Sequence, residues 1–309
     1  MERYLIGAGG WAYFQTPGVH SLISYSWVFN FVEVNSTFYE LPSLSQAGRW
    51  RRLVPEDFEF AVRAHRSVTQ THRLQPSGEI PRILGGLKDI CEILRAEILH
   101  FQMPPTLKID QAAIGNLRRV IASSDLGEIR VAMEFRGSNT DLPVELIRTM
   151  EEYDIIHCVD LLKGEVPAVR SDVLYSRLFG KARYNIYQPT DEELGEIDNT
   201  AVGGKFRKVM LSFHGLRMYK DAARLKSYRQ TGEFPKITRF TGLESLEEVL
   251  MEDARFPATK QDLLDHQGWK LFDLTEEKRI RAGAVLQKLP KEEYSSISDL
   301  IKDLCQIME

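Results

Sequence analysis

The chain of 309 residues has only three cysteines, Cys91, Cys158 and Cys305. They lie far apart, form no C-x-x-C pair and are odd in number, which is not the pattern of a disulfide framework or a zinc knuckle. We therefore expect free thiols. The 43% of hydrophobic residues would then supply an ordinary apolar core.

Long apolar runs are also missing. Nowhere do about 18 consecutive apolar residues occur, so no membrane span is predicted. The start, "MERYLIGAGG", lacks the basic segment and apolar stretch of a signal peptide. No low-complexity tract or internal repeat is visible. We expect a cytoplasmic globular protein.

A strong charge of one sign is absent, since the formal net charge is −4. Residues 1–231 carry 29 basic and 28 acidic groups, whereas residues 232–309 carry 11 and 16. One basic block, 201–231, has eight Lys and Arg residues against the single acid Asp221. Such a block is typical of a solvated helix face, and a ligand site is the alternative.

Short β-type runs alternate with helical patterns along the first three quarters of the chain. The runs predict strands over 3–7, 31–35, 58–64, 97–102, 129–135, 155–160, 172–178 and 207–213. Helical spacing or capping predicts helices over 44–53, 80–94, 111–123, 142–153 and 219–230. This alternation indicates a (β/α)8 TIM-type barrel over 1–231, with a doubly wound open sheet as the competitor.

From residue 232 the pattern becomes helical, and we expect a small all-α domain over 232–309. Its predicted helices are 244–253, 259–267, 275–288 and 298–307, with Thr259, Thr275 and Ser298 as caps. This domain is a candidate interaction module for a protein partner.

The stretch "FVEVN" sets the orientation of the strands. Val32 and Val34 suit the face toward the helices, so Glu33 and Asn35 point into the barrel near its C-terminal mouth, where barrel active sites are built. The other strand ends share this parity and place polar side chains at the same mouth; they are Arg63, His65, Gln102, Glu134, Arg136, Asp160, Arg177 and His214. Inward charges must be paired, hydrated or used by a ligand, so an ion network without chemistry is the alternative to a site.

The motifs "VEVNSTFYELPS", "FEFAVRAHRSVTQTHRL", "HFQMPP", "VAMEFR" and "LYSRLFG" resemble the YecE-like family, catalogued as domain of unknown function 72. The resemblance covers about residues 3–230 and implies a TIM-type barrel. The positions that match the family pattern are Glu33, Asn35, Ser36, Thr37, Phe38, Tyr39, Gln102, Pro104, Pro105, Glu134, Arg136, Asp160 and Arg177. Phe179 stands where the family usually has a histidine. Residues 256–304 resemble a helical module catalogued as domain of unknown function 2795, which implies interaction and no chemistry.

Two motifs near the mouth bear on the ligand. "GAGGWA", 7–12, fits a dinucleotide fingerprint, but Pro17 and Gly18 follow where the phosphate-binding helix should begin, so a nucleotide cofactor is not expected. We expect a first barrel loop at which backbone approaches a ligand, with Trp11 as a wall. "RAHRSVTQTHRL", 63–74, concentrates Arg and His without an acid, which favours binding of a phosphate or carboxylate over a basic surface loop.

The leading hypothesis is an enzyme that hydrolyses or rearranges an anionic, phosphate-bearing substrate such as a nucleotide, nucleic acid or sugar phosphate, by acid–base or metal-assisted chemistry. Glu33, Glu134, His65 and Asp160 are the expected catalytic residues. The expected substrate-binding residues are Trp11, Asn35, Tyr39, Arg63, Gln102, Arg136, Arg177 and His214. A divalent metal on these carboxylates and imidazoles is left open. The alternative is a non-catalytic scaffold that binds a ligand or a protein.

Overall fold

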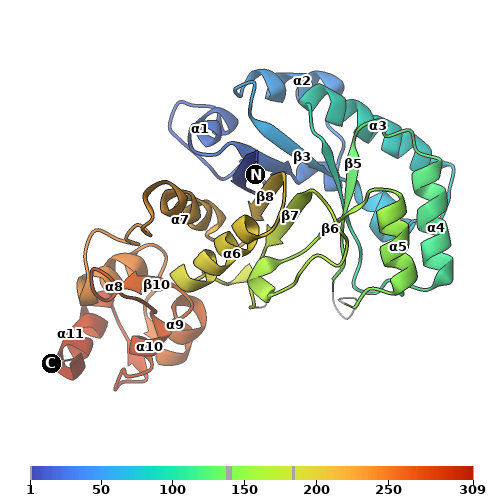
Figure 1. Cartoon of the computed structure of the whole chain (residues 1–309). Coiled ribbons are helices and arrows are strands. Elements are labelled where there is room, and N and C mark those ends of the chain that lie inside the picture. Colours follow the sequence, from blue (N-terminus) through green and yellow to red (C-terminus); the bar gives the residue numbers. More distant parts are fainter. Residues whose placement is uncertain (1, 137–140, 183–184, 309) are drawn as a thin grey trace. The chain divides into compact units, whose positions relative to one another are not determined.

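The computed structural model describes residues 2–136, 141–182 and 185–308. Its first strands and helices form a barrel, shown in Figure 1. The eight strands are β1 (Arg3–Ala8), β2 (Phe31–Val34), β3 (Glu59–Arg63), β4 (Ile98–Gln102), β5 (Arg130–Glu134), β6 (Ile156–Cys158), β7 (Val173–Leu178) and β8 (Lys208–Phe213). Each lies within the predicted run or within one residue of it. The predicted strands are therefore confirmed.

The pairings among these eight strands are parallel, in the order β6-β5-β4-β3-β2-β1-β8-β7. A parallel bridge between Val159 and Ser176 joins the two ends. The strands therefore close into a barrel, which confirms the TIM-type architecture and excludes the open sheet.

Helices lie around the strands, as α2 to α5 do in Figure 1. They are α1 (Ser21–Val28), α2 (Leu44–Arg52), α3 (Glu79–Leu94), α4 (Gln111–Ala122), α5 (Val144–Glu152), α6 (Asp191–Gly203) and α7 (Met218–Thr231). Ser43 caps α2, since its side chain accepts a hydrogen bond from the Gln46 amide. The sequence patterns missed α1 and α6. The β6–β7 connection departs from the regular alternation, because it holds only the 3-10 helix η3 (Leu161–Lys163).

The barrel interior is packed in layers. Arg3, Glu59 and Lys208 form an ionic layer at the N-terminal end, where Lys208 Nζ lies 3.0 Å from Glu59 Oε2. An apolar layer follows, built from Leu5, Phe31, Ala61, Ile98, Ala132, Ile156, Cys158, Val173, Tyr175 and Met210. Two residues further along β2, β5 and β7 come Glu33, Glu134 and Arg177, so the apolar layer supports a charged layer at the mouth.

Compactness divides the chain into two units. The first comprises Met1–Phe179, Ile197–His214 and Met218–Ala223, and the second comprises Gly180–Glu196, Gly215–Arg217 and Arg224–Glu309. The expected domain boundary between residues 231 and 232 stays a prediction. No helix in the described part of the chain is long and apolar enough to cross a lipid bilayer.

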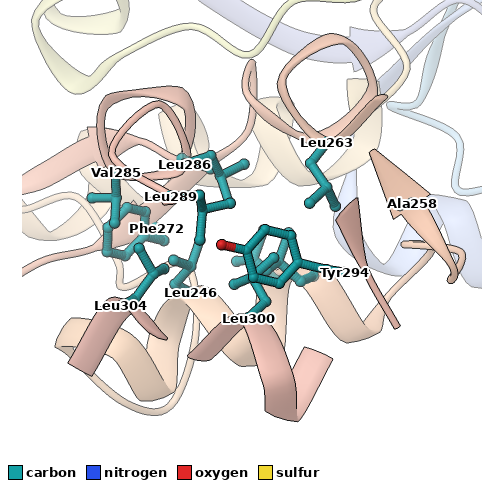
Figure 2. Packing of buried hydrophobic residues seen from close by; sticks show 13 residues of the cluster. Leu246, Ala258, Leu263, Phe272, Val285, Leu286, Leu289, Tyr294, Leu300 and Leu304 are labelled. Atoms are coloured by element: carbon teal, nitrogen blue, oxygen red, sulfur yellow. The ribbon is translucent and has the colours of Figure 1, made fainter. Parts of the chain in front are cut away.

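The C-terminal region has its own apolar core, and Figure 2 shows Tyr294 among leucines from several helices. Its helices are α8 (Gly242–Met251), α9 (Lys260–Gln267), α10 (Gly283–Leu286) and α11 (Ile297–Met308), which confirms a small, mainly helical C-terminal part. Four short strands add to it: β9 (Ala258–Thr259), β10 (Leu271–Asp273), β11 (Arg279–Arg281) and β12 (Glu293–Tyr294). The helix predicted over 275–288 is wrong in its first half, because β11 pairs antiparallel with β10 there.

Gly7 permits the close approach of β1 to β2. A Cβ atom at Gly7 would lie 2.0 Å from the Phe31 carbonyl oxygen and 2.8 Å from the Tyr25 hydroxyl. The same hydroxyl donates to the Phe31 carbonyl at 2.7 Å and accepts from the Ala8 amide at 2.7 Å. Any larger residue would push β1 away from these partners.

We expect Gly7→Ala to lower the free energy of unfolding by at least about 2 kcal/mol, because the added methyl group overpacks a closed interface. Gly85→Ala is the matched control, since its Cβ meets nothing within 4 Å on the exposed face of α3. That change should raise stability by about 0.5–1 kcal/mol. Urea unfolding followed by circular dichroism measures both, and equal effects would contradict the packing of Gly7.

Candidate functional site

The centre of the mouth is the guanidinium of Arg177 on β7. Its Nε and Nη2 atoms each donate to Glu33 on β2 at 2.9 Å, which makes a bidentate pair. Its Nη1 donates to Glu134 Oε2 on β5 and, at 3.3 Å, to Gln102 Oε1 on β4. Arg177 is only 2% exposed and Glu33 is fully buried, so this is an interior ion pair.

Glu33 and Glu134 each accept a further hydrogen bond from another side chain. Tyr175 donates its hydroxyl to Glu33 Oε2, and Arg136 Nε donates to Glu134 Oε1 at 2.6 Å. His100 Nε2 lies 3.2 Å from Glu134 Oε2, although the angles there are not those of a hydrogen bond. Neither carboxylate therefore has an oxygen that stands without a partner.

The ion pairs decide the protonation states. Burial, the largest single effect, would raise the pKa of Glu33 and Glu134, but Arg177 and the other side chains around each carboxylate together outweigh it and hold both pKa values well below the ordinary range. Burial would lower the pKa of Arg177, yet the two carboxylates raise it above its usual value. All three groups are consequently ionised at neutral pH.

Arg63 on β3 has a different environment. Its Nη1 donates to Asn35 Oδ1 at 3.1 Å and its Nη2 donates to Gln102 Oε1, while its guanidinium carbon lies 3.7 Å from the ring centroid of Phe38. Both side-chain hydrogen-bond acceptors are neutral amides. No carboxylate in the described part of the chain forms an ion pair with Arg63. Burial and the nearby positive charge of Arg177 lower its pKa to about 10.

These side chains form one continuous network, which we call the mouth cluster: Glu33, Asn35, Arg63, Gln102, Glu134, Arg136 and Arg177. His214 lies beside it, with Nε2 3.8 Å from Glu33 Oε1 and 3.0 Å from Ser212 Oγ. Burial, followed by the charge of Arg177, lowers the pKa of His214 well below its usual value, so the imidazole is neutral. The structure thus brings eight of the twelve predicted site residues together.

Phe179 closes one side of the cluster. Its ring stacks on His214 with centroids 4.6 Å apart, and the guanidinium carbons of Arg136 and Arg177 lie 4.5 and 5.1 Å from its centroid. Where the family usually has a histidine, this chain therefore places an apolar ring that both arginines contact through cation–π interactions. A titratable group is absent at this position.

Asp160 lies apart from the mouth cluster. Its carboxylate accepts hydrogen bonds from the backbone amides of Leu162 and Phe179, both at 3.1 Å, and caps η3. Burial raises its pKa to about 6. The expected catalytic role of Asp160 stays a prediction, and these contacts give the residue a structural task in positioning Phe179.

His65 and Tyr39 meet each other outside the cluster. His65 Nε2 lies 3.1 Å from the Tyr39 carbonyl oxygen, and Tyr39 is 66% exposed. The set of Glu33, His65, Glu134, Asp160 and His214, considered as metal ligands, is not assembled. In the part of the chain that the structure describes, no group of three His, Cys, Asp or Glu side chains could hold a metal ion.

Trp11 lines a cavity of about 420 Å³ beside the cluster. Asn35 and Gly9 also line this cavity, which we call the aromatic cavity, and Asn35 Nδ2 donates to the Gly9 carbonyl at 2.9 Å. A Cβ at Gly9 would lie 2.3 Å from the His214 ring. The absence of a side chain at Gly9 therefore lets His214 lie against the loop that follows β1.

The sequence patterns did not predict two buried residues that lie beside the glutamates of the mouth cluster. Tyr175 and His100 each precede a predicted site residue by two positions, Arg177 and Gln102, and so share its inward parity. Strand parity alone could have found them. Burial and the charge of Arg177 lower the pKa of His100 to about 4, so it is neutral at pH 7.

Four of the eight basic residues in the block over 201–231 form ion pairs with acids outside the block. Lys208 belongs to the ionic layer at the opposite end of the barrel, and Arg207 Nε pairs with Asp172 Oδ2 at 2.9 Å. In the second unit, Arg217 pairs with Glu252 and Arg224 with Asp191. These four basic side chains therefore act as partners in structural ion pairs.

A parallel eight-stranded barrel with a charged network at its C-terminal mouth defines a TIM-type barrel protein. The chain belongs to the family described as "Protein of unknown function DUF72", whose model matches residues 5–236. The resemblance of the helical tail to a second family stays a prediction.

Known relatives agree with this membership. The chain is 27% identical over 171 residues to UPF0759 protein YunF of Bacillus subtilis strain 168; the match covers 50% of this chain and 58%, less than two thirds, of that protein. Crystal structures of DUF72 family proteins from Enterococcus faecalis V583 and Thermotoga maritima MSB8 both have a TM-score of 0.60. Their identities are 14% and 20%; each match covers 74% of this chain, and 98% and 100% of those chains respectively. Both share the fold.

We expect Glu33→Gln to lower the free energy of unfolding at pH 7 by about 3 kcal/mol, because it removes one charge of a buried pair and leaves Arg177 undercompensated. The control is Glu56→Gln, the same change at an exposed pair in which Glu56 Oε1 lies 2.9 Å from Arg95 Nη1. That variant should unfold at the wild-type urea concentration. Indistinguishable midpoints for the two variants would contradict the structural role of Glu33.

The depressed pKa of His100 predicts a loss of stability in acid. Its folded pKa of about 4 lies below the ordinary 6.5, so the unfolded chain binds more protons as the pH falls through 6.5 toward 4. His100 should account for about 2 kcal/mol of the stability lost between pH 7 and pH 5. His100→Gln should flatten the dependence by that amount in urea unfolding at each pH; an unchanged slope would refute this assignment.

Proposed function

We propose that the barrel mouth binds a small, phosphate-bearing anion and that the protein acts on it as an enzyme. The observation that carries this proposal is the guanidinium of Arg63, which is partly buried and has only neutral side-chain acceptors. A buried charge without a counter-ion is unfavourable unless a ligand supplies one. An anion beside Arg63 would supply it.

The charges of the whole mouth cluster support the same conclusion. It contains three guanidinium groups and two carboxylates, and the adjoining His100 and His214 are neutral near pH 7. Arg177 pairs with both carboxylates and Arg136 pairs with Glu134, so these two guanidinium groups balance the two negative charges. The one excess positive charge consequently belongs to Arg63, which favours an anionic ligand over a neutral or cationic one.

Guanidinium groups suit phosphate, because two parallel N–H groups match two phosphate oxygens. Arg136 keeps one third of its side chain exposed, and its Nη atoms make no hydrogen bond within the described residues. We propose that Arg63 and Arg136 hold the anion and stabilise negative charge that develops on it during reaction. Arg177 acts as a fixed positive centre behind them.

The proposed chemistry assigns charge balance, rather than proton transfer, to Glu33. Both of its oxygens accept hydrogen bonds from Arg177, and its pKa is strongly depressed, so it is a weak base. Glu134 has the same depressed pKa, but it is the better placed of the two for acid–base work, because its partner Arg136 keeps one third of its side chain exposed at the mouth. His65 stays a candidate catalytic residue, but it lies outside the mouth cluster, so the substrate would have to extend to it.

A non-catalytic binding protein is the second candidate, and the complete hydrogen bonding of Glu33 and Glu134 favours it. In that case the mouth would bind the anion without converting it. The expected binding of a protein partner by the C-terminal region is a separate prediction and does not depend on either candidate.

Isothermal titration with inorganic phosphate and pyrophosphate tests the anion site. We expect Arg63→Ala to weaken binding at least tenfold, because a hydrogen bond to a charged group contributes about 1.5–3 kcal/mol. Arg119→Ala removes an exposed arginine from α4 and should leave affinity unchanged. Equal affinities in wild type and Arg63→Ala would refute the proposal.

Turnover separates the two candidates. Release of phosphate from a panel of phosphate esters by the wild type, abolished in Arg136→Ala, would support the enzyme. Tight binding by the wild type without release or rearrangement of any bound ester would support the binding protein. Strong loss of affinity with added salt would point to nucleic acid as the ligand, whereas a small metabolite should show a weak dependence.

A further inference from the structure

The aromatic cavity adjoins the proposed anion site through one residue. Asn35 lines the cavity and also accepts the 3.1 Å hydrogen bond from Arg63 Nη1. Gly9 lines it too and contacts His214, which lies against the mouth cluster. A ligand whose anionic group binds Arg63 would therefore have the cavity beside it.

Aromatic side chains dominate the walls of this cavity. Trp11 and Trp50 meet edge to face, with ring centroids 5.2 Å apart and planes at 78°, and Tyr13 and Tyr219 lie on other parts of the wall. Tyr13 is 83% exposed, which is unusual for a large aromatic ring without a partner to cover it. Such walls offer flat apolar faces on which a planar ring can stack.

Charged groups are scarce by comparison. Among the described residues that line the cavity there is no Asp, Glu, Lys or Arg. Its polar side chains are His20, Ser21, Asn35 and Ser36, and both ends of the Asn35 amide already have partners, the Gly9 carbonyl and Arg63. A sugar ring carries several hydroxyl groups that each need a hydrogen-bond partner when buried. A planar heteroaromatic ring needs few partners and gains from stacking.

We propose that the aromatic cavity binds the base of a mononucleotide whose phosphate occupies the anion site at Arg63. The inference rests on the proposed function and narrows its substrate class from any phosphate-bearing compound to nucleoside phosphates. The cavity volume of about 420 Å³ falls within the range of pockets that hold molecules of this size. Trp11 and Trp50 would provide the stacking surface, and Asn35 would separate base from phosphate.

Isothermal titration of the full chain with five probes tests the proposal: inorganic phosphate, ribose 5-phosphate, glucose 6-phosphate, adenosine and AMP. We expect AMP to bind at least tenfold more tightly than ribose 5-phosphate and to quench tryptophan fluorescence. Equal affinity for AMP and ribose 5-phosphate would overturn the base site. Glucose 6-phosphate binding as tightly as AMP would also overturn it, in favour of a sugar ring in the cavity.

Matched tryptophan variants locate the base. Trp11→Leu should bring AMP affinity down to that of ribose 5-phosphate while the latter stays at its wild-type value. Trp27→Leu removes an indole that is 66% exposed on α1 and outside the cavity, so it should change neither affinity. A loss that is the same for both ligands in Trp11→Leu would overturn the proposal. Tyr13→Ala repeats the test without disturbing the core, because Tyr13 is exposed.

The two proposals fail differently. If phosphate and ribose 5-phosphate bind in an Arg63-dependent way but AMP binds no more tightly than ribose 5-phosphate, the anion site is supported and the base site is refuted. If AMP binds no better than adenosine, and Arg63→Ala changes nothing, the cavity binds a base and the anion site fails. If none of the compounds binds, both proposals fail.

Discussion

The ion pair between Arg177 and the two glutamates at the end of the barrel determines the rest of the site. A guanidinium that is 2% exposed requires negative charge at hydrogen-bond distance, and Glu33 and Glu134 provide it from two different strands. Their ionised state keeps Arg177 charged and fixed in orientation. Arg136 offsets the second carboxylate, so Arg63 carries the positive charge that has no counter-ion among the described residues.

Much of this arrangement followed from strand parity. The apolar residues Val32 and Val34 indicated the outer face of β2. The alternation of side chains along each strand then placed Glu33, Glu134 and Arg177 inside the barrel, before their hydrogen-bond partners were known. Parity could not predict which arginine pairs with which glutamate, because that depends on the distances between strands that are far apart in sequence. Hence the sequence suggested a proton-transferring Glu33, whereas its contacts are those of a counter-ion to Arg177.

The catalytic role expected for Asp160 stays a prediction, since its carboxylate accepts hydrogen bonds from the backbone amides of Leu162 and Phe179. The secondary-structure predictions that departed from the structure have physical reasons. The segment 275–288 starts with a capping threonine and acids, yet "RIR" at 279–281 pairs with β10, because tertiary pairing overrides local helix propensity. Helix α6 was missed although Leu194, Ile197 and Ala201 form a buried stripe at helical spacing.

The central claim is that the mouth holds an anion at the outer arginines while Arg177 stays paired with Glu33. A crystal soaked in tungstate and measured at the tungsten edge tests it directly, because the anomalous signal locates a phosphate-like anion without reference to activity. We expect a peak within hydrogen-bond distance of Arg63 or Arg136, with both Arg177 to Glu33 hydrogen bonds retained. An empty mouth with tungstate bound elsewhere, or an anion that displaces Glu33 from Arg177, would contradict it.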